Sequence, residues 1–224
     1  MTQPNTTVCN AVQQRTRIKM CGFTREADVL AACAAGADAI GFVLYPPSPR
    51  AVSVNRAAEL ASLLPPFVCP VLLFVNENAD RIQAACRQVP GAVLQFHGDE
   101  SPAFCESFKR PFIKAIRMKA GVNLLEESSK FHAAQALLVD SWSEAYGGTG
   151  HTFDWSLLPK AGELRQALVL SGGLDESNVA QAIAALKPYG VDVSSGIESA
   201  RGVKSIEKIE MFCKAVQKAD AGLL

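Results

Sequence analysis

Short apolar runs alternate with stretches of helical spacing along most of this chain. Eight runs rich in β-branched and apolar residues read as strands, and a helical pattern follows most of them. The predicted strands are Arg17–Cys21, Ala39–Leu44, Val71–Asn76, Val93–His97, Phe112–Arg117, Ala136–Ser141, Ala167–Ser171 and Val191–Ser194. Because a parallel strand pair needs a long crossover, usually a helix, this alternation favours a parallel sheet.

Helical patterns occupy most of the intervals between these strands. Glu26–Ala35 is dense in Ala, and Ala79–Gln88 repeats apolar residues at helical spacing. Pro102 suits the first turn of a further helix, because its missing N–H leaves no helical hydrogen bond unmade there. The interval 119–134, which contains Gly121 and a polar run, has the least distinct helix boundaries. The remaining predicted helices are Asn55–Leu64, Asn178–Leu186 and Ile206–Lys218.

Two parallel-sheet architectures compete at this point, a closed barrel and an open doubly wound sheet. Eight strand–helix units match the barrel count, and 224 residues lie at the compact end of its size range. No GxGxxG follows the first strand, which weakens the dinucleotide-binding alternative. We therefore predict an α/β protein with a single (β/α)8 TIM barrel as its catalytic domain over residues 17–224. A flexible N-terminal tail is expected over residues 1–16.

Composition limits the classes of partner. Apolar residues make up 49% of the chain, enough for a large core, and 22 basic residues balance 22 acidic ones. A nucleic-acid binder usually concentrates basic residues on one face, so we expect no nucleic-acid partner. Prolines interrupt the longest apolar run, near residues 63–75, so we expect no membrane span. Seven dispersed cysteines without a CxxC pair fit reduced thiols in the cytoplasm.

In a (β/α)8 barrel the active site lies where the strands end and the following loops begin. Two neighbouring strand ends are rich in small residues, LSGGL at 170–174 and VSSGIE at 193–198. Small residues let backbone N–H groups approach a ligand closely, and the seventh and eighth loops of such barrels commonly bind phosphate. These glycines could instead serve tight turns alone, but two adjacent loops of this kind favour a phosphate site.

Cys21 ends the first predicted strand, and Lys19 shares its face because alternate strand residues point the same way. If that face is the inner one, an ammonium group lies one layer below the thiol. A nearby cation favours the thiolate and lowers the pKa of a thiol, and a thiolate can act as a general base. The alternative is that Cys21 is a small core residue, which is the role we expect for the other cysteines.

Two aspartates belong to buried strands. Asp140 follows the apolar run ALLV, where a carboxylate is costly unless it is paired or functional. Its alternative role is that of a loop hydrogen-bond acceptor. Asp192 shares a strand face with Ser194, and we interpret it as a structural residue of the binding region that pairs with Lys19 or holds the phosphate loop.

Other polar features at the strand ends are less specific. His97 closes the fourth strand, and without a second His or Cys at ligand spacing we expect no metal site. Arg50 follows the rigid segment YPPSP, so it could hold a carboxylate or phosphate over the barrel mouth or be an ordinary solvated cation. The glycine-rich run 146–155 lacks the spacing of a P-loop and fits a lid or anion-contacting loop.

Together these segments resemble the phosphoribosylanthranilate isomerase family. Each motif is modest alone, but their order and spacing from about residue 17 to the C-terminus make the set highly specific. Two peripheral departures are Ser205 in the GVKS segment, where the family often has an acidic residue, and Asp175 after LSGGL. The matching segments are IKMCG (18–22), GADAIGFVLYPPSPR (36–50), LQFHGDE (94–100), LLVDS (137–141), GGTG (147–150), LSGGL with Asn178, and VDVSSGIE (191–198).

The resemblance implies an Amadori rearrangement of N-(5′-phosphoribosyl)anthranilate in tryptophan biosynthesis, without metal or organic cofactor. It implies that Asp140 is the general acid and Cys21 the general base. Arg50 would meet the anthranilate carboxylate, and His97 would line the pocket. The enzyme would be a cytoplasmic monomer or homodimer. Backbone amides would hold the ribose phosphate, with Ser194 nearby: those of Gly172, Gly173, Ser195 and Gly196.

Two alternative functions remain open at this point. The histidine-pathway aminosugar isomerase performs the same rearrangement on a bis-phosphorylated substrate, but it uses an aspartate where Cys21 stands and needs a second phosphate site. A non-catalytic barrel that binds a phosphate ligand would need the glycine loops but not the combination of Cys21 with Asp140.

Overall fold

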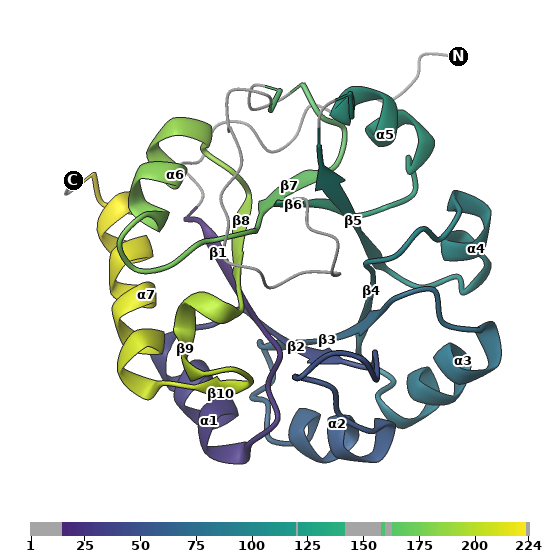
Figure 1. The fold of residues 1–224 in the computed structure, drawn as a ribbon, viewed down its shortest axis with the longest axis horizontal. Coiled ribbons are helices and arrows are strands. Elements are labelled where there is room, and N and C mark those ends of the chain that lie inside the picture. The colour runs from purple at the N-terminus through teal and green to yellow at the C-terminus, as the bar shows by residue number, and fades with distance from the viewer. Residues whose placement is uncertain (1–14, 120, 142–157, 160–162, 223–224) are drawn as a thin grey trace.

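The computed structural model describes residues 15–119, 121–141, 158–159 and 163–222. Eight parallel strands close into a barrel in the order of the sequence, and the helices surround it (Figure 1). β8 pairs with β1 to complete the ring. The prediction of a (β/α)8 barrel is therefore confirmed. The strands are β1 (Arg17–Cys21), β2 (Ala39–Val43), β3 (Cys69–Phe74), β4 (Val93–Phe96), β5 (Phe112–Met118), β6 (Ala136–Ser141), β7 (Ala167–Leu170) and β8 (Gly190–Val193).

All eight predicted strands are present, with shifts at some ends. β3 begins at Cys69 rather than at the predicted Val71, because Cys69 and Pro70 already pair with Ala39 and Ile40 of β2. Pro70 is tolerated so close to the start of a strand because it withholds only one N–H from the ladder.

The helices also follow the predicted pattern, and several begin at a side-chain cap. Ser53 accepts a hydrogen bond from the backbone of Arg56, so α2 starts there, and it ends at Ala61 rather than at the predicted Leu64. Asn123 caps α5 inside the interval whose boundaries the sequence left indistinct. The helices are α1 (Glu26–Ala35), α2 (Val54–Ala61), α3 (Ala79–Gln88), α4 (Pro102–Ser107), α5 (Leu124–Lys130), α6 (Val179–Leu186) and α7 (Ile206–Asp220).

The loop after β8 contains short elements that the sequence did not predict. A single 3-10 turn, η2 (Ser195–Ile197), is followed by a two-stranded antiparallel hairpin of β9 (Glu198–Ala200) and β10 (Val203–Lys204). This hairpin leads into α7. It places the last part of the VSSGIE motif beside the barrel mouth.

Strand alternation divides the core into an outer and an inner part. On β6, Leu137 and Val139 belong to the large cluster between strands and helices, whereas Leu138 belongs to a small cluster inside the barrel. Asp140 has the parity of Leu138, so it faces inward at the end of the strand. A second inner cluster contains Cys21 and Val43. The inner face of the barrel therefore ends in the residues that form the site.

The first described residues are attached to the barrel. Thr16 donates from its backbone N and its hydroxyl to the Asp220 carboxylate, at 2.8 and 2.7 Å. Arg15 forms an ion pair with Asp38. The rest of the predicted tail, and the predicted lid over residues 146–155, lie outside the described residues. Within the described part of the chain, no helix is long and apolar enough to cross a membrane.

Phe96 offers a test of the outer core. It is fully buried on β4 and its ring lies 6.1, 5.8 and 5.8 Å from those of Phe104, Phe108 and Phe112. Phe96→Ala should lower the free energy of unfolding in urea by about 3–5 kcal/mol. The control is Phe67, whose side chain is 97% exposed. Phe67→Ala should change the free energy of unfolding by less than about 0.5 kcal/mol. Equal losses in the two variants would contradict this packing.

Candidate active site

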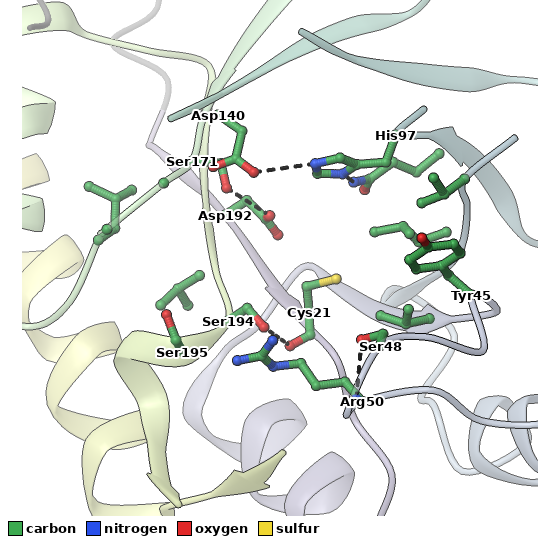
Figure 2. A pocket seen from close by; sticks show the side chains of 18 residues that line it. Cys21, Tyr45, Ser48, Arg50, His97, Asp140, Ser171, Asp192, Ser194 and Ser195 are labelled. Atoms are coloured by element: carbon green, nitrogen blue, oxygen red, sulfur yellow. Dashed lines mark hydrogen bonds and ion pairs between the residues drawn. The ribbon is translucent and has the colours of Figure 1, made fainter. Parts of the chain in front are cut away.

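The carboxyl ends of the strands surround a cavity at the barrel mouth (Figure 2). Its empty space is about 670 Å³, including a part open to solvent. Gly196 of η2 is not among the lining residues, although the sequence grouped it with them. The predicted site residues that line the cavity are Cys21, Arg50, His97, Asp140, Gly172, Gly173, Asp192, Ser194 and Ser195.

Cys21 ends β1 with its thiol directed into the cavity (Figure 2). The neighbouring residue on β2 is Gly41, the register partner of Cys21. A Cβ at Gly41 would lie 2.7 Å from the Cys21 sulfur, which is too close for a real contact. The Cys21 carbonyl accepts a hydrogen bond from the Ser194 hydroxyl at 3.0 Å. The thiol therefore occupies space that exists because residue 41 has no side chain.

The structure corrects the expected charge balance at Cys21. Burial raises the pKa of the Cys21 thiol, and the Asp192 carboxylate raises it further. The Lys19 and Lys204 ammonium groups lower this pKa, as the sequence suggested for Lys19, but they do not overcome burial. The sequence indicates the nearby cation, whereas the extent of desolvation depends on how deeply the fold buries the thiol. The thiol pKa of the free protein thus lies above its ordinary value.

Asp192 makes the ion pair with Lys19 that the sequence suggested. Lys19 Nζ donates to Asp192 Oδ1 at 2.6 Å, and both side chains are buried. Burial alone would lower the pKa of Lys19, but the negative charges of Asp192 and of the thiolate form of Cys21 outweigh it, so this pKa is raised. Asp192 Oδ2 accepts from the Ser171 hydroxyl at 3.1 Å. Asp192 therefore links β1 to the first residue of the glycine loop after β7.

Asp140 lies beside His97 in the same cavity. Its Oδ2 atom is 3.2 Å from His97 Nε2, and both side chains are buried (Figure 2). His97 Nδ1 is in turn 3.0 Å from Nε2 of Gln95. Gln95 belongs to the LQFHGDE segment, but no role was predicted for it. Its position two residues before His97 on one strand was the available signal, because such residues share a face.

Arg50 is buried, with 8% of its surface exposed, so it is not an ordinary solvated cation. Its Nε and Nη2 atoms donate to the two carboxylate oxygens of Glu198 at 2.6 and 2.8 Å. Lys204 Nζ also donates to Glu198, at 3.0 Å, and to the Ser194 carbonyl at 2.9 Å. Burial alone would raise the pKa of Glu198, but Arg50 and Lys204 together hold it below its usual value. No role was predicted for Glu198 or Lys204 from the sequence.

The two glycine loops touch each other. Gly172 and Gly173 have φ values of 86° and 66°, in the left-handed region that favours glycine. A Cβ at Gly196 would lie only 2.0 Å from the Leu174 carbonyl oxygen, so the loop after β8 packs directly on the loop after β7. The two loops thus lie against each other, and both contribute residues that line the cavity.

The cavity wall formed by residues of β2, β3 and the loops that follow them is apolar. Val43, Leu73 and Val75 line it and pack together with the Cys21 side chain, and Tyr45 packs against them. The cavity therefore combines a glycine-rich polar end with an apolar wall. Within the described residues, no group of three or more His, Cys, Asp or Glu is arranged to hold a metal ion.

Comparison with known proteins identifies the family. A family model described as N-(5'phosphoribosyl)anthranilate (PRA) isomerase matches residues 18–215. The chain belongs to this family. An N-(5'-phosphoribosyl)anthranilate isomerase from Methylibium petroleiphilum is 55% identical over 207 residues, which are 92% of this chain and 96% of that one. This chain is thus an isomerase of a family that serves tryptophan biosynthesis, as its motifs predicted.

Solved structures of family members have the same fold. The phosphoribosyl anthranilate isomerase of Thermotoga maritima is 39% identical with a TM-score of 0.83, and the match covers 90% of this chain and 98% of that one. A further structure is of a phosphoribosyl anthranilate isomerase in complex with reduced 1-(o-carboxyphenylamino)-1-deoxyribulose 5-phosphate. It is 36% identical with a TM-score of 0.80, over 90% of this chain and 98% of that one.

Gly41→Ala tests the space around the thiol. The added methyl group would meet the Cys21 sulfur, which must rotate away from its present position. We expect isomerase turnover to fall at least about tenfold, because small misplacements of reacting groups are costly. The control is Gly91→Ala, since nothing lies within 4 Å of a Cβ there. Turnover and thermal unfolding of both variants are compared, and unchanged turnover in Gly41→Ala would contradict the contact.

Proposed function

We propose that this chain isomerises N-(5′-phosphoribosyl)anthranilate to 1-(o-carboxyphenylamino)-1-deoxyribulose 5-phosphate, with Asp140 as general acid and Cys21 as general base. The observation that carries the proposal is that one cavity contains the thiol, the carboxylate and the two glycine loops. A single ligand held by the loops would therefore meet both groups. The family membership of the chain supports the substrate.

The two ends of the cavity match the two ends of this substrate. Backbone amides at Gly172, Gly173, Ser195 and Gly196, with Ser194 nearby, would bind the ribose phosphate. The apolar wall of β2 and β3 would take the anthranilate ring. Arg50 would bind the anthranilate carboxylate through Nη1, since Glu198 uses only Nε and Nη2. In this arrangement Glu198 orients the guanidinium rather than neutralising it completely.

The reaction needs an acid first and a base second. Asp140 donates its proton to the furanose ring oxygen as the C1′–O bond breaks, and the anthranilate nitrogen lone pair forms the C1′ iminium. The Cys21 thiolate then removes the C2′ proton, and the C2′–H electrons form the enolamine while the iminium π electrons return to nitrogen. The enolamine gains a proton at C1′ and loses the C2′ hydroxyl proton, which gives the ketone. No electrons leave the substrate, so the change is an isomerisation.

The charges around the site fit these two roles. After Asp140 has given up its proton, its carboxylate can accept a hydrogen bond from His97 Nε2, which lies 3.2 Å away. Lys19 and Lys204 favour the thiolate form of Cys21 against the effect of burial. The thiolate would therefore be a minor but strongly basic form at neutral pH, which suits removal of a proton from carbon.

Removing either reacting group should abolish most of the activity. Cys21→Ala and Asp140→Asn should each lower turnover by about 10²–10⁴-fold, the usual contribution of acid–base catalysis, while binding of the reduced product analogue persists. Decay of substrate fluorescence measures turnover, and calorimetry measures binding. Cys213→Ala is the matched control, because this thiol is equally buried but lies on α7 outside the cavity.

The same assays distinguish the alternatives. Turnover near that of the unmodified protein in either site variant would refute the role assigned to that residue. A non-catalytic phosphate-binding barrel would bind the analogue without any turnover in the unmodified protein. A histidine-pathway isomerase would turn over the bis-phosphorylated aminosugar, which we expect this chain to leave unchanged because it has Cys21 where that family has an aspartate.

The pH dependence tests the charges around the thiol. Since the base is a thiolate, kcat/KM should rise with pH up to the pKa of Cys21. Lys19 lowers this pKa and Asp192 raises it. Lys19→Met should therefore shift the rising limb to higher pH, and Asp192→Asn should shift it to lower pH. Shifts of opposite sign support both assignments, and an unchanged limb in both variants would contradict them.

A further inference from the structure

Among the described residues, one buried side-chain polar atom has no hydrogen-bond partner, the amide oxygen Oε1 of Gln95. Gln95 is 1% exposed on β4 and borders the active-site cavity. Leaving such an acceptor unpaired away from water is unfavourable, so buried polar groups are nearly always satisfied. A state of the site in which Oε1 has a donor would explain its presence.

The present orientation of the amide determines where the His97 proton lies. Gln95 Nε2 is 3.0 Å from His97 Nδ1, and an amide nitrogen can only donate. Nδ1 must then be the acceptor, so the neutral ring carries its proton on Nε2 and donates it to Asp140 Oδ2 at 3.2 Å. This orientation therefore corresponds to an Asp140 that has lost its acid proton.

Adding one proton to the His97–Asp140 pair changes His97 Nδ1 from a hydrogen-bond acceptor to a donor. If the proton resides on Asp140, the acid donates to Nε2 and the ring must carry its own proton on Nδ1. If the proton resides on His97, both ring nitrogens are donors. In either case Nδ1 becomes a donor. A half-turn of the Gln95 amide brings Oε1 to the place of Nε2, because the two ends have nearly the same shape.

We propose that Gln95 is a positioning residue that acts through His97 on the general acid. Its Oε1 accepts from His97 Nδ1 while the pair carries the proton destined for the ring oxygen, and its Nε2 donates to Nδ1 after that proton has left. The amide thus provides a hydrogen bond in both proton states of the pair. This inference rests on the proposed role of Asp140 as general acid.

The first test reads the His97 tautomer in the free protein. Nitrogen-15 NMR distinguishes protonated from unprotonated imidazole nitrogens, and His97→Asn identifies the His97 signals among the three histidines of the chain. With Asp140 ionised, the unmodified protein should carry the ring proton on Nε2. While its carboxylate is ionised, Gln95→Glu can only accept, so it should add a proton at Nδ1 and leave both ring nitrogens protonated. Gln95→Met should keep the proton on Nε2, because ionised Asp140 still accepts there. A proton on Nδ1 in the unmodified protein, or an unprotonated Nδ1 in Gln95→Glu, would overturn the proposal.

The second test separates positioning from stability. Gln95→Met should lower kcat about tenfold, the loss expected for one hydrogen bond, with KM nearly unchanged. Gln95→Glu should also lower kcat, because it keeps the acceptor but loses the donor. Gln166→Met is the matched control: Gln166 is also buried, but its amide contacts Ser128 and Phe131 outside the cavity. Gln166→Met should therefore lower the free energy of unfolding and leave kcat unchanged.

The outcomes also separate this inference from the proposed function. Gln95→Met with unchanged kcat, or with a loss no larger than in Gln166→Met, would overturn the positioning role alone. Full turnover in Asp140→Asn would instead refute Asp140 as the general acid. The positioning role of the Gln95 amide in catalysis would then fall with it. The tautomer measurement uses no substrate, so it can fail while the assignment of Asp140 stands.

Discussion

The ion pair between Lys19 and Asp192 lies at the seam where the barrel closes. The two residues are register partners on β1 and β8, and their charged atoms are 2.6 Å apart inside the barrel. Loss of one partner would leave a buried charge unpaired, which costs about 3–5 kcal/mol. The same two charges act on Cys21 in opposite directions. An ion pair at the closing seam of the barrel therefore also affects the basicity of the proposed base.

A second network holds the rim of the cavity. Glu198, from the hairpin after β8, accepts hydrogen bonds from Arg50 and Lys204. Lys204 also donates to the Ser194 carbonyl, and the Ser194 hydroxyl donates to the Cys21 carbonyl. The position of Arg50, the glycine loop after β8 and the end of β1 are thus linked. Arg50, which we propose binds the substrate carboxylate, and Cys21, the proposed base, are thus held in one geometry by buried, paired charges.

Strand geometry explains why so many reactive groups meet here. Side chains alternate between the helices and the barrel interior, so Asp140 faces inward with Leu138, and His97 faces inward with Gln95. Below them the interior is closed by small apolar residues, such as Ala115. Several of the described inward polar residues lie toward the carboxyl ends of the strands. There they line the cavity or, like Lys19, form buried pairs.

Local sequence patterns were enough to predict the architecture and many of the residues that line the cavity. Local periodicity is set by neighbouring residues, so it predicted eight strands and the strand ends at Cys21 and Asp140. The small residues in LSGGL and VSSGIE likewise marked the two loops that meet at Gly196. These inferences succeed because each depends on residues close together in the chain.

Only the tertiary structure decided how distant residues are paired. Arg50 and Glu198 are 148 positions apart, and no local pattern joins them. The contact of His97 with Asp140 depends on strand register and side-chain rotamers across the barrel. The direction of the Cys21 pKa also required the fold, because it is the balance between desolvation and the charges that the fold places around the thiol. Sequence periodicity gives the face of a residue, whereas burial and partners arise only when all eight strands close.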